Sequence, residues 1–408
     1  MLQTNDNLSR ELNELFLMLS KSLDITKTQY DNLTRSYSAV GKYLEEDPEL
    51  SSYHPVITPQ GSLRLGTIIQ PINEEDDLDV DLVYRLIEKG PTWTQFELKT
   101  RVGNRLKSHS LYKEMLDKEG RRCWTLLYRQ NSDNNKERYH MDILPCVAES
   151  TYLERFHILN ASGFDAQVID DISIRITDNK CDNYKTSICI REWMKSNPDG
   201  YAMWFASRCN IMSQNSRALL ENVVPVRKYV ENKTILQRIV QILKRHRDVM
   251  FNGDKDKPIS IIITTLAAKA YKGEDNLFIG LNNVIDGMES EIHKNQDGTY
   301  IIENPVNSEE NFADKWPTHP KRRKNFYKWL AAVKKDMHEI LDGANRIQIQ
   351  IIMGRVFGKN IIEKASSLLV ERRKSKLATG AALLTSAGEV AANTVGKVIN
   401  TANTFYGE

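Results

Sequence analysis

The sequence predicts an α+β protein with two lobes and a central cleft. Short runs in which apolar and polar residues alternate, such as residues 79–83 and 171–177, predict strands of a mixed sheet that is complete by about residue 180. From residue 185 to residue 373, apolar residues recur at helix spacing without a fixed repeat length. The chain has 408 residues, of which 40% are apolar, which is enough for two globular units. We therefore expect a sheet-containing domain over 1–180, a helical domain over 181–374 and a low-complexity tail over 375–408.

The order of the expected elements follows from the same patterns. Two amphipathic helices precede the sheet, one with apolar residues from Leu8 to Leu19 and one from Tyr30 to Leu44. The last helical pattern is interrupted at Gly354 or Gly358. Further helices are expected over 93–110, 229–251, 260–271, 321–341 and 344–370, strands over 123–128 and 139–147, and loops over 254–258 and 303–320.

A phosphate-binding turn is predicted at residues 60–62, Gln60-Gly61-Ser62. Gly61 has no side chain, so a phosphate can approach its backbone N–H, and Ser62 adds a hydroxyl beside it. The segment that follows, residues 63–69, can open a helix whose N-terminus favours anions. This stretch is therefore a candidate site for a triphosphate.

A metal site is predicted directly after this turn. Residues two apart on a strand share a face, so Asp79 and Asp81 project together while Val80 enters a core. Two adjacent carboxylates repel each other unless a cation lies between them, and Mg²⁺ prefers oxygen ligands. One alternative to a metal site is that Asp79 and Asp81 belong to a solvated face that continues the acidic run 74–77. Another is that the metal-binding pair is Asp77 and Asp79.

Asp142 is the candidate for a third carboxylate. It lies between the apolar residues Met141 and Ile143, which predicts a second strand beside the first. Three carboxylates can hold a pair of Mg²⁺ ions, for which Mn²⁺ is a possible substitute. His140 lies on the same face as Asp142, where it either accepts a proton or supports a metal ligand.

Together these residues resemble the palm of polymerase-β-like nucleotidyltransferases. More specifically, the sequence resembles the cyclic GMP-AMP synthase-like nucleotidyltransferases of bacteria, which act in CBASS antiphage defence. These enzymes are related to the 2′-5′ oligoadenylate synthases. The stretches that carry the resemblance are QGS, DVDLV, SNPDGYAMWFASR, LQRIVQILKRHRD and PISIIITTLAAKAY, in that order along most of the chain. It implies a palm braced from behind by N-terminal helices and an oligoadenylate-synthase-like helical domain.

The resemblance also implies two residues of the helical domain. Lys244 and Ser260 match the lysine and the serine that hold the triphosphate tail in this family, and a lysine is a suitable charge for a polyphosphate. The alternatives are that Lys244 is a solvated charge beside Arg245 and Arg247, and that Ser260 is a helix N-cap after Pro258.

The implied function is synthesis of a cyclic di- or trinucleotide from ATP or GTP with release of pyrophosphate. The product would activate a cyclic-nucleotide-dependent effector. Two other functions are open: nucleotidyl transfer to an RNA 3′ end or a protein, and a non-catalytic nucleotide-binding scaffold. Three side chains at the end of the last expected strand are candidates for choosing the base: Arg175, Thr177 and Asp178.

Composition argues against several partners. The net charge of +2 gives no global attraction to nucleic acid or membrane, although the basic and aromatic segment 315–335 could be a local nucleic-acid patch. Trp329, Leu330 and Val333 within it have the spacing of a packed helix. The five cysteines are scattered without C-x-x-C spacing, which is typical of reduced thiols. The sequence also shows neither a signal sequence nor a spanning helix, so we expect a cytoplasmic protein.

The tail offers two interpretations. It is rich in small residues and has Gly407 next to last, so it is a candidate handle for a ubiquitin-transfer-like protein, a partner that the family resemblance implies. Alternatively it forms a terminal helix docked on the body through its apolar residues, Leu383, Leu384, Val390, Val395, Val398 and Ile399.

Overall fold

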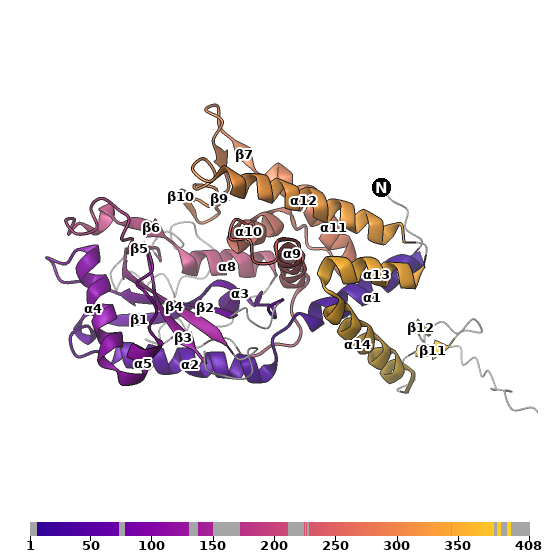
Figure 1. Ribbon diagram of the computed structural model, residues 1–408, viewed down its shortest axis with the longest axis horizontal. Helices are drawn as coiled ribbons and strands as arrows, with labels where there is room; N and C mark the ends of the chain where they lie inside the picture. The colour runs from indigo at the N-terminus through magenta and orange to yellow at the C-terminus, as the bar shows by residue number, and fades with distance from the viewer. Residues whose placement is uncertain are drawn as a thin grey trace, which may run out of the picture.

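Two lobes lie side by side in the structure, a computed structural model (Figure 1). One lobe contains a mixed sheet flanked by helices, and the other is mostly helical. The residues that the structure describes are 6–72, 78–129, 138–149, 172–210, 224, 226, 228–343, 345–378, 382–384 and 390–392.

The sheet of the first lobe has six strands among the described residues. They are β1 (Pro55–Gln60), β2 (Leu78–Leu86), β3 (Trp124–Tyr128), β4 (Tyr139–Ala148), β5 (Ile174–Ile176) and β6 (Met194–Ser196). The strand order is β1-β2-β4-β5-β6. Strands β3 and β5 pair with the same edge of β4, β3 with its first half and β5 with its end. Of the strand pairs in this described sheet, only β2 and β4 run parallel. The sheet therefore continues past residue 180, where the sequence predicted its end, because β6 adds to β5.

Helices α2 (Lys27–Glu45), α4 (Gln95–Ser108) and α5 (Ser110–Met115) belong to the sheet-containing lobe. Thr26 and Gln29 form a capping box that starts α2, which satisfies backbone N–H groups that a helix start leaves open. The buried face of α2 includes Leu33 and Tyr37, which join the apolar core beneath β2 and β4. This helix does pack on the sheet, as expected.

The helical lobe contains α1 (Asp6–Ser22), α8 (Pro198–Arg208), α9 (Ile235–Phe251), α10 (Ser260–Ala270), α11 (Leu277–Gly287), α12 (Pro320–Leu341), α13 (Arg346–Phe357) and α14 (Lys359–Ala378). The expectation that the first N-terminal helix braces the sheet is wrong. Phe16 of α1 packs against Phe278 and Phe357, with ring centroids 5.2 and 5.9 Å away. Its amphipathic pattern indicated a buried face but not which lobe would cover it.

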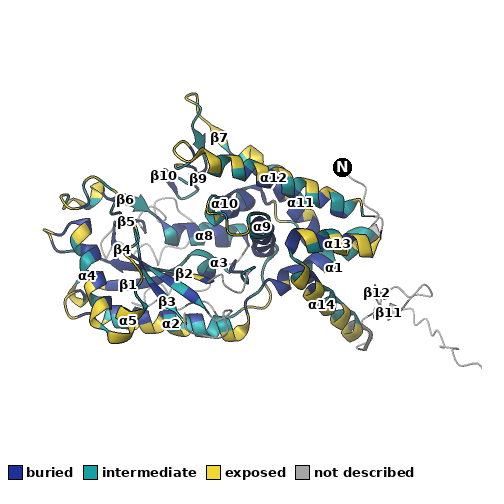
Figure 2. Ribbon diagram, viewed as in Figure 1, coloured by how far each residue is buried: buried dark blue, intermediate teal, exposed yellow. Residues whose placement is uncertain are grey.

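Helix α9 lies at the centre of the helical lobe and is buried around its whole circumference from Leu236 to Arg247 (Figure 2). Its polar side chains reach into the other lobe. Gln237, Gln241 and Lys244 donate hydrogen bonds to the carbonyls of Leu65, Ile68 and Thr67 at 2.8, 2.8 and 3.0 Å. The segment that follows the predicted phosphate-binding turn is thus attached to α9.

A small β region joins the lobes a second time. It consists of β7 (His293–Lys294), β8 (Tyr300–Ile301), β9 (Glu303–Asn304) and β10 (Asn307–Asn311), so residues 303–311 form two paired strands where a loop was expected. Strand β10 contacts β6, and Asn307 Nδ2 donates to the Lys195 carbonyl at 3.4 Å. The contact of β10 with β6 and the hydrogen bonds from α9 to residues 65–68 lie on either side of a cleft between the lobes.

The remaining predictions concern the C-terminal part. The last long helical pattern is divided into α13 and α14 at Gly358, one of the two glycines expected to interrupt it. Beyond α14, β11 (Ala382–Leu384) and β12 (Val390–Ala392) pair as antiparallel strands, so Leu383, Leu384 and Val390 are not in the docked helix that was considered. Val395, Val398, Ile399 and residues 404–408 lie outside the described residues. Within the described chain no helix has the length and apolarity needed to span a membrane.

Candidate active site

Three predicted site residues and one further residue form a row across the sheet. The register pairs Gln60 of β1 with Asp81 of β2, Asp81 with Asp142 of β4, and Asp142 with Thr125 of β3. Neighbouring strands lie roughly 4.8 Å apart, so Asp81 and Asp142 are direct neighbours. Thr125 Oγ1 donates to Asp142 Oδ1 at 2.6 Å, which fixes the position of that carboxylate.

Asp79 and His140 form the next pair along β2 and β4. His140 Nε2 contacts the Asp79 carboxylate, while 69% of the Asp79 side chain is exposed. The alternation of the strand is as predicted, because Leu78, Val80 and Leu82 are buried in the core. His140 is thus placed to orient Asp79. The alternative pair with Asp77 falls on a residue outside the described ranges.

The electrostatics of the two carboxylates differ. Burial and the negative charges of Asp79 and Asp142 raise the pKa of Asp81 to about 7. The position of Asp79 in the cleft opposes ionisation, but the hydrogen bond and charge of His140 lower the pKa of this carboxyl below its ordinary value. Asp81 therefore lies in a negative field that a cation would relieve.

Gly61 starts the short helix α3 (Gly61–Leu65) with a φ of +64°. A Cβ atom at this position would lie 1.9 Å from Oδ2 of Asp81, far inside contact distance. Glycine is therefore required both by the backbone conformation and by the close approach of the carboxylate. The predicted phosphate-binding turn and the predicted metal site are in direct contact.

Asp199 of α8 supports this turn and was not predicted as a site residue. Its carboxylate is buried and bridges Arg64 of α3 and Arg85 of β2, the latter at 2.7 Å. Burial opposes ionisation, but the two guanidinium groups hold the pKa of Asp199 well below its usual range. No local sequence signal identifies this cluster, because its three members are far apart along the chain.

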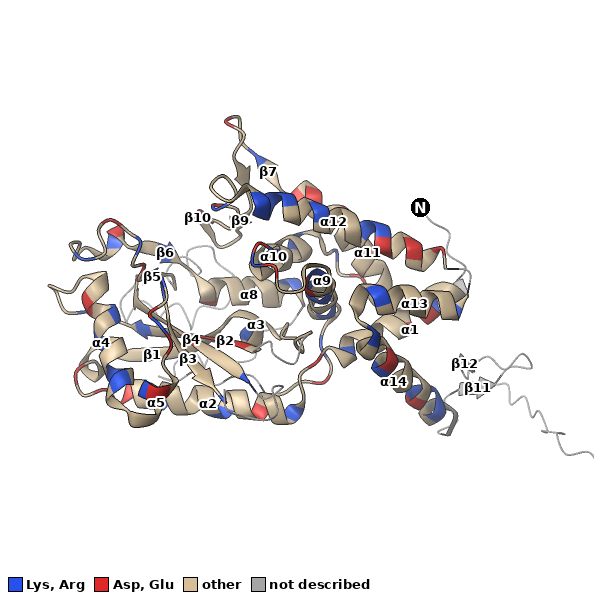
Figure 3. Ribbon diagram, in the orientation of Figure 1, with Lys and Arg blue, Asp and Glu red and all other residues tan. Residues whose placement is uncertain are grey.

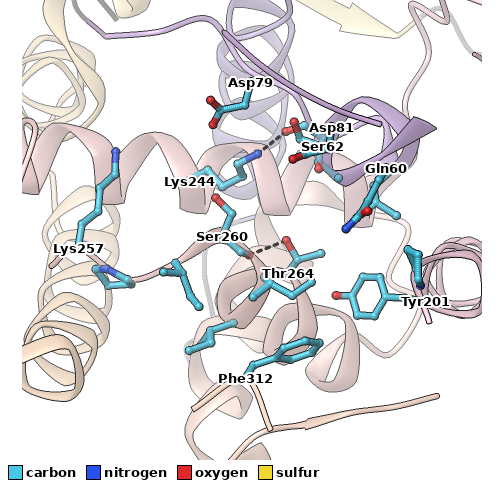
Figure 4. Close-up of a pocket in the computed structure, with 18 of the residues that line it drawn as sticks. Gln60, Ser62, Asp79, Asp81, Tyr201, Lys244, Lys257, Ser260, Thr264 and Phe312 are labelled. Atoms are coloured by element: carbon cyan, nitrogen blue, oxygen red, sulfur yellow. Dashed lines mark hydrogen bonds between the residues drawn. The ribbon is translucent and has the colours of Figure 1, made fainter. Parts of the chain in front are cut away.

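Lys244 and Ser260 approach the carboxylates from the helical lobe (Figure 4). Lys244 is buried, so the alternative of a solvated surface charge is wrong. Burial and the charge of Arg247 lower the pKa of Lys244 to about 8, although Asp248, Asp79 and Asp81 favour its charged form. Ser260 is the first residue of α10 after the N-cap Ile259, and its Oγ accepts a hydrogen bond from Arg247 at 2.8 Å.

A cavity of about 820 Å³ lies between the lobes, and seven of the eight predicted site residues line it. They are Gln60, Gly61, Ser62, Asp79, Asp81, Lys244 and Ser260; Asp142 lies behind Asp81 and does not line it. Basic side chains from both lobes line the same cavity, among them Arg64, Arg122, Lys195, Arg247, Lys257 and Arg322. The arrangement suits a polyphosphate chain next to a carboxylate pair.

The carboxylates fit Mg²⁺ by donor type and by charge. Asp79 and Asp81 offer oxygen ligands, and the raised pKa of Asp81 reflects its burial together with the negative charge of its carboxylate neighbours. Within the described ranges, however, no three His, Cys, Asp or Glu side chains are gathered around one point. Asp142 is turned to Thr125 and Asp79 to His140, so their side chains would have to turn toward a bound ion.

The three candidates for base choice do not line the cavity. Arg175 is engaged by Glu149 and by the Trp193 carbonyl, and Thr177 is buried. Asp178 accepts hydrogen bonds from Arg121 and Arg122 at 2.7 and 3.0 Å. It therefore acts on the cavity only through Arg122, which sequence reasoning did not single out.

The basic start of α12 is visible in Figure 3, within the segment considered as a nucleic-acid patch. Lys321 lies 3.2 Å from both Asp254 and Asp256, and Arg322 lies 3.4 Å from Asp256. Trp329, Leu330 and Val333 are buried in the core, as their spacing predicted. Part of the positive charge is thus compensated within the protein.

Comparisons with known proteins agree with this geometry. Residues 11–163 match the Second Messenger Oligonucleotide or Dinucleotide Synthetase domain family. A Roseivirga ehrenbergii protein named c-di-GMP synthase is 27% identical over 415 residues, covering 98% of this chain and 99% of that protein.

Solved structures show the same fold. The Bradyrhizobium diazoefficiens CD-NTase CdnG in complex with GTP has a TM-score of 0.62 at 17% identity, covering 88% of this chain and 99% of its own. The Vibrio cholerae dinucleotide cyclase with ATP and GTP has a TM-score of 0.53 at 14% identity, covering 88% and 89%. They confirm the expected α+β architecture of a polymerase-β-like palm with a helical domain. Residues 11–163 thus match the second-messenger synthetase family, and the fold over most of the chain is similar to that of the CD-NTases, as its motifs suggested.

Proposed function

We propose that the protein is a Mg²⁺-dependent nucleotidyltransferase that joins ATP or GTP units into a cyclic di- or trinucleotide. The observation that carries this proposal is the contact between Gly61 and Asp81 in a cavity that Lys244 enters from the other lobe. The predicted phosphate-binding turn, the carboxylate pair and the ammonium group of Lys244 thus line the same cavity. The name of the Roseivirga relative supports a dinucleotide product made from guanine nucleotides.

The chain's own residues would position the triphosphate. The backbone N–H of Gly61 and the hydroxyl of Ser62 would donate to phosphate oxygens, while Lys244 would neutralise their charge from the helical lobe. Arg247 orients Ser260, whose hydroxyl lies at the start of α10. Polyphosphate binding would therefore draw on both lobes and hold the α-phosphate next to the carboxylates.

Asp79, Asp81 and Asp142 would hold two Mg²⁺ ions, or Mn²⁺ as a substitute. When bound, such ions neutralise the charge of the phosphates and lower the pKa of the attacking hydroxyl. His140 would orient Asp79, and Thr125 would orient Asp142. These positioning contacts come from β3 and β4, which form part of the rigid sheet.

In each transfer, a ribose hydroxyl oxygen of one nucleotide forms a bond to the α-phosphorus of another. The bond from that phosphorus to the β-phosphate oxygen breaks, pyrophosphate leaves with the electron pair, and the hydroxyl proton passes to solvent. A linear product is formed first, and a last transfer between its own ends closes the ring. Each phosphodiester bond formed thus releases one pyrophosphate.

The test is incubation of the protein with labelled ATP, GTP, CTP and UTP and Mg²⁺, followed by phosphatase. A cyclic product has no terminal phosphate and resists the phosphatase, so a resistant small product supports the proposal. The label would instead appear on an added RNA or on protein if the chain transfers nucleotides to a macromolecule. Binding without any product would indicate a non-catalytic scaffold.

The setting of this activity is part of the proposal. The product would act as a second messenger in bacterial antiphage defence, made in the cytoplasm and sensed by a cyclic-nucleotide-activated effector. The C-terminal tail would be a handle for a ubiquitin-transfer-like protein. Support for the handle comes from the described residues after Ala378, the end of α14, which form only the short strands β11 and β12.

A further inference from the structure

One end of the cavity, away from the carboxylates, carries a set of side chains that the triphosphate site does not use. It is formed by β10 and the residues that follow it, by the start of α8 and by Arg122. We propose that this end binds the base of a guanine nucleotide, with Glu310 and Arg122 reading its edge. The proposal rests on the proposed function and assigns the base specificity of that same cavity.

Glu310 offers a carboxylate in a partly buried position. It lies at the end of β10 and lines the cavity, and its Oε2 accepts a hydrogen bond from Asn304 at 2.8 Å. Burial raises the pKa of Glu310, while the Asn304 hydrogen bond and the charge of Arg122 act in the opposite direction. An ionised carboxylate has about four acceptor positions, so the hydrogen bonds of Asn304 and Asn307 leave others for a ligand.

Arg122 of the sheet-containing lobe lines the same cavity as Glu310, and its charge acts on this carboxyl. Its Nε donates to Asp178 at 3.0 Å and its Nη2 approaches the Met194 sulfur at 3.1 Å, so the guanidinium plane is held in place while it lines the cavity. Arginine can donate two parallel hydrogen bonds to O6 and N7 of guanine. The buried acid Asp178 thus positions a donor at the cavity.

Two aromatic rings form the apolar wall at this end. Tyr201 of α8 and Phe312, just after β10, both line the cavity, and their rings meet edge to face at 6.1 Å. Figure 4 shows both rings on the side of the cavity away from Asp79. The Tyr201 hydroxyl pairs with Thr265 at 2.9 Å, which fixes the ring. Aromatic faces of this kind stack with a nucleobase.

The pairing of a carboxylate with an arginine distinguishes guanine from adenine. Guanine presents the N1–H and N2–H donors that a carboxylate accepts, and the O6 and N7 acceptors that an arginine needs. Adenine has an unprotonated N1 and no 2-amino group, so its edge would face Glu310 with a lone pair. A site whose buried polar groups are left unpaired rejects the wrong base strongly.

Binding of nucleoside diphosphates tests the proposal separately from catalysis, because they cannot release pyrophosphate. Inosine diphosphate differs from GDP only by the 2-amino group that Glu310 would accept. We expect the wild-type protein to bind GDP roughly tenfold to a hundredfold more tightly than IDP or ADP. In Glu310→Gln the GDP-to-IDP affinity ratio should fall towards one. Glu303→Gln, on β9 of the same hairpin and outside the cavity, should keep the wild-type ratio.

The outcomes separate the two proposals. Equal binding of GDP, IDP and ADP by the wild-type protein would overturn guanine recognition here, and so would an unchanged ratio in Glu310→Gln. The wild-type comparison needs no variant, so it stands even if Glu310→Gln fails to fold. Guanine selectivity without any phosphatase-resistant product would instead contradict the proposed enzyme and leave the base assignment intact.

Discussion

Replacing Gly61 with alanine tests the contact between the phosphate-binding turn and the carboxylates. The new Cβ would lie 1.9 Å from Asp81 Oδ2, where an unstrained contact needs more than 3 Å, so the two groups must separate by more than 1 Å. A misplacement of about 1 Å in a catalytic site can lower the rate roughly a hundredfold. We therefore expect kcat to fall at least about a hundredfold in Gly61→Ala.

The stability effect should be small by comparison. An alanine at a φ of +64° is strained by about 1–2 kcal/mol. An unfolding entropy of about 2.1 cal/mol/K per residue over 408 residues gives about 0.9 kcal/mol/K, so this strain lowers Tm by about 1–2 °C. Gly273→Ala is a matched control, since Gly273 has a φ of +88° and, apart from its two chain neighbours, no residue has an atom within 4 Å of the position that its methyl group would take.

Steady-state kinetics and thermal melting of both variants check this reasoning. The two should lose similar stability, and only Gly61→Ala should lose activity. Wild-type turnover in Gly61→Ala would refute the close packing of Asp81 on the turn. A loss of activity in Gly273→Ala would show that backbone strain alone, and not the carboxylate contact, is responsible.

Three further changes test other parts of the site. Asp79→Asn combined with Asp81→Asn removes two charges while keeping shape, so synthesis should fall below detection with an unchanged circular dichroism spectrum; retained synthesis would remove the metal assignment. Asp199→Asn leaves Arg64 and Arg85 without their shared carboxylate, which costs about 3–5 kcal/mol, or about 3–6 °C in Tm at neutral pH. The pKa of Asp199 is lower in the folded than in the unfolded protein, so its contribution to the free energy of unfolding is full above about pH 4 and is lost as the pH falls. The melting curves of variant and wild type should therefore converge in acid. Nucleotide affinity should weaken between pH 7 and 9 as Lys244, with a pKa of about 8, loses its charge, and a flat profile would contradict its phosphate role.

The strands that carry the carboxylates could be predicted because their chemistry is local. Asp79 and Asp142 each stand between apolar residues, and alternation alone places them on one face of a strand. Strand β1 was missed because Pro55 and Pro59 argue against a strand. It is an edge strand, paired only with β2 among the described strands, where prolines are tolerated.

Other features depend on contacts between distant segments. The polar run of β10 has no alternation, and its strand conformation comes from pairing with β9 and from contact with β6. Asp199 looks like an ordinary first-turn acid of a helix, and only the fold brings it between Arg64 and Arg85. The apolar stripe of α1 predicted burial, but the choice between two available cores is a tertiary property.

The hydrogen bonds from α9 to residues 65–70 limit how the protein can open. Besides the bonds of Gln237, Gln241 and Lys244, Arg245 reaches the Gln70 carbonyl at 3.5 Å. Exchanging each such bond for bonds to water costs about 0.5–1.5 kcal/mol, so the four bonds together oppose parting of this seam by about 2–6 kcal/mol. Separation of the lobes along α9 is therefore unfavourable. On the other side of the cavity, where β10 meets β6, Asn307 reaches the Lys195 carbonyl at 3.4 Å, so we expect the protein to open more easily at this hairpin than along the central helix.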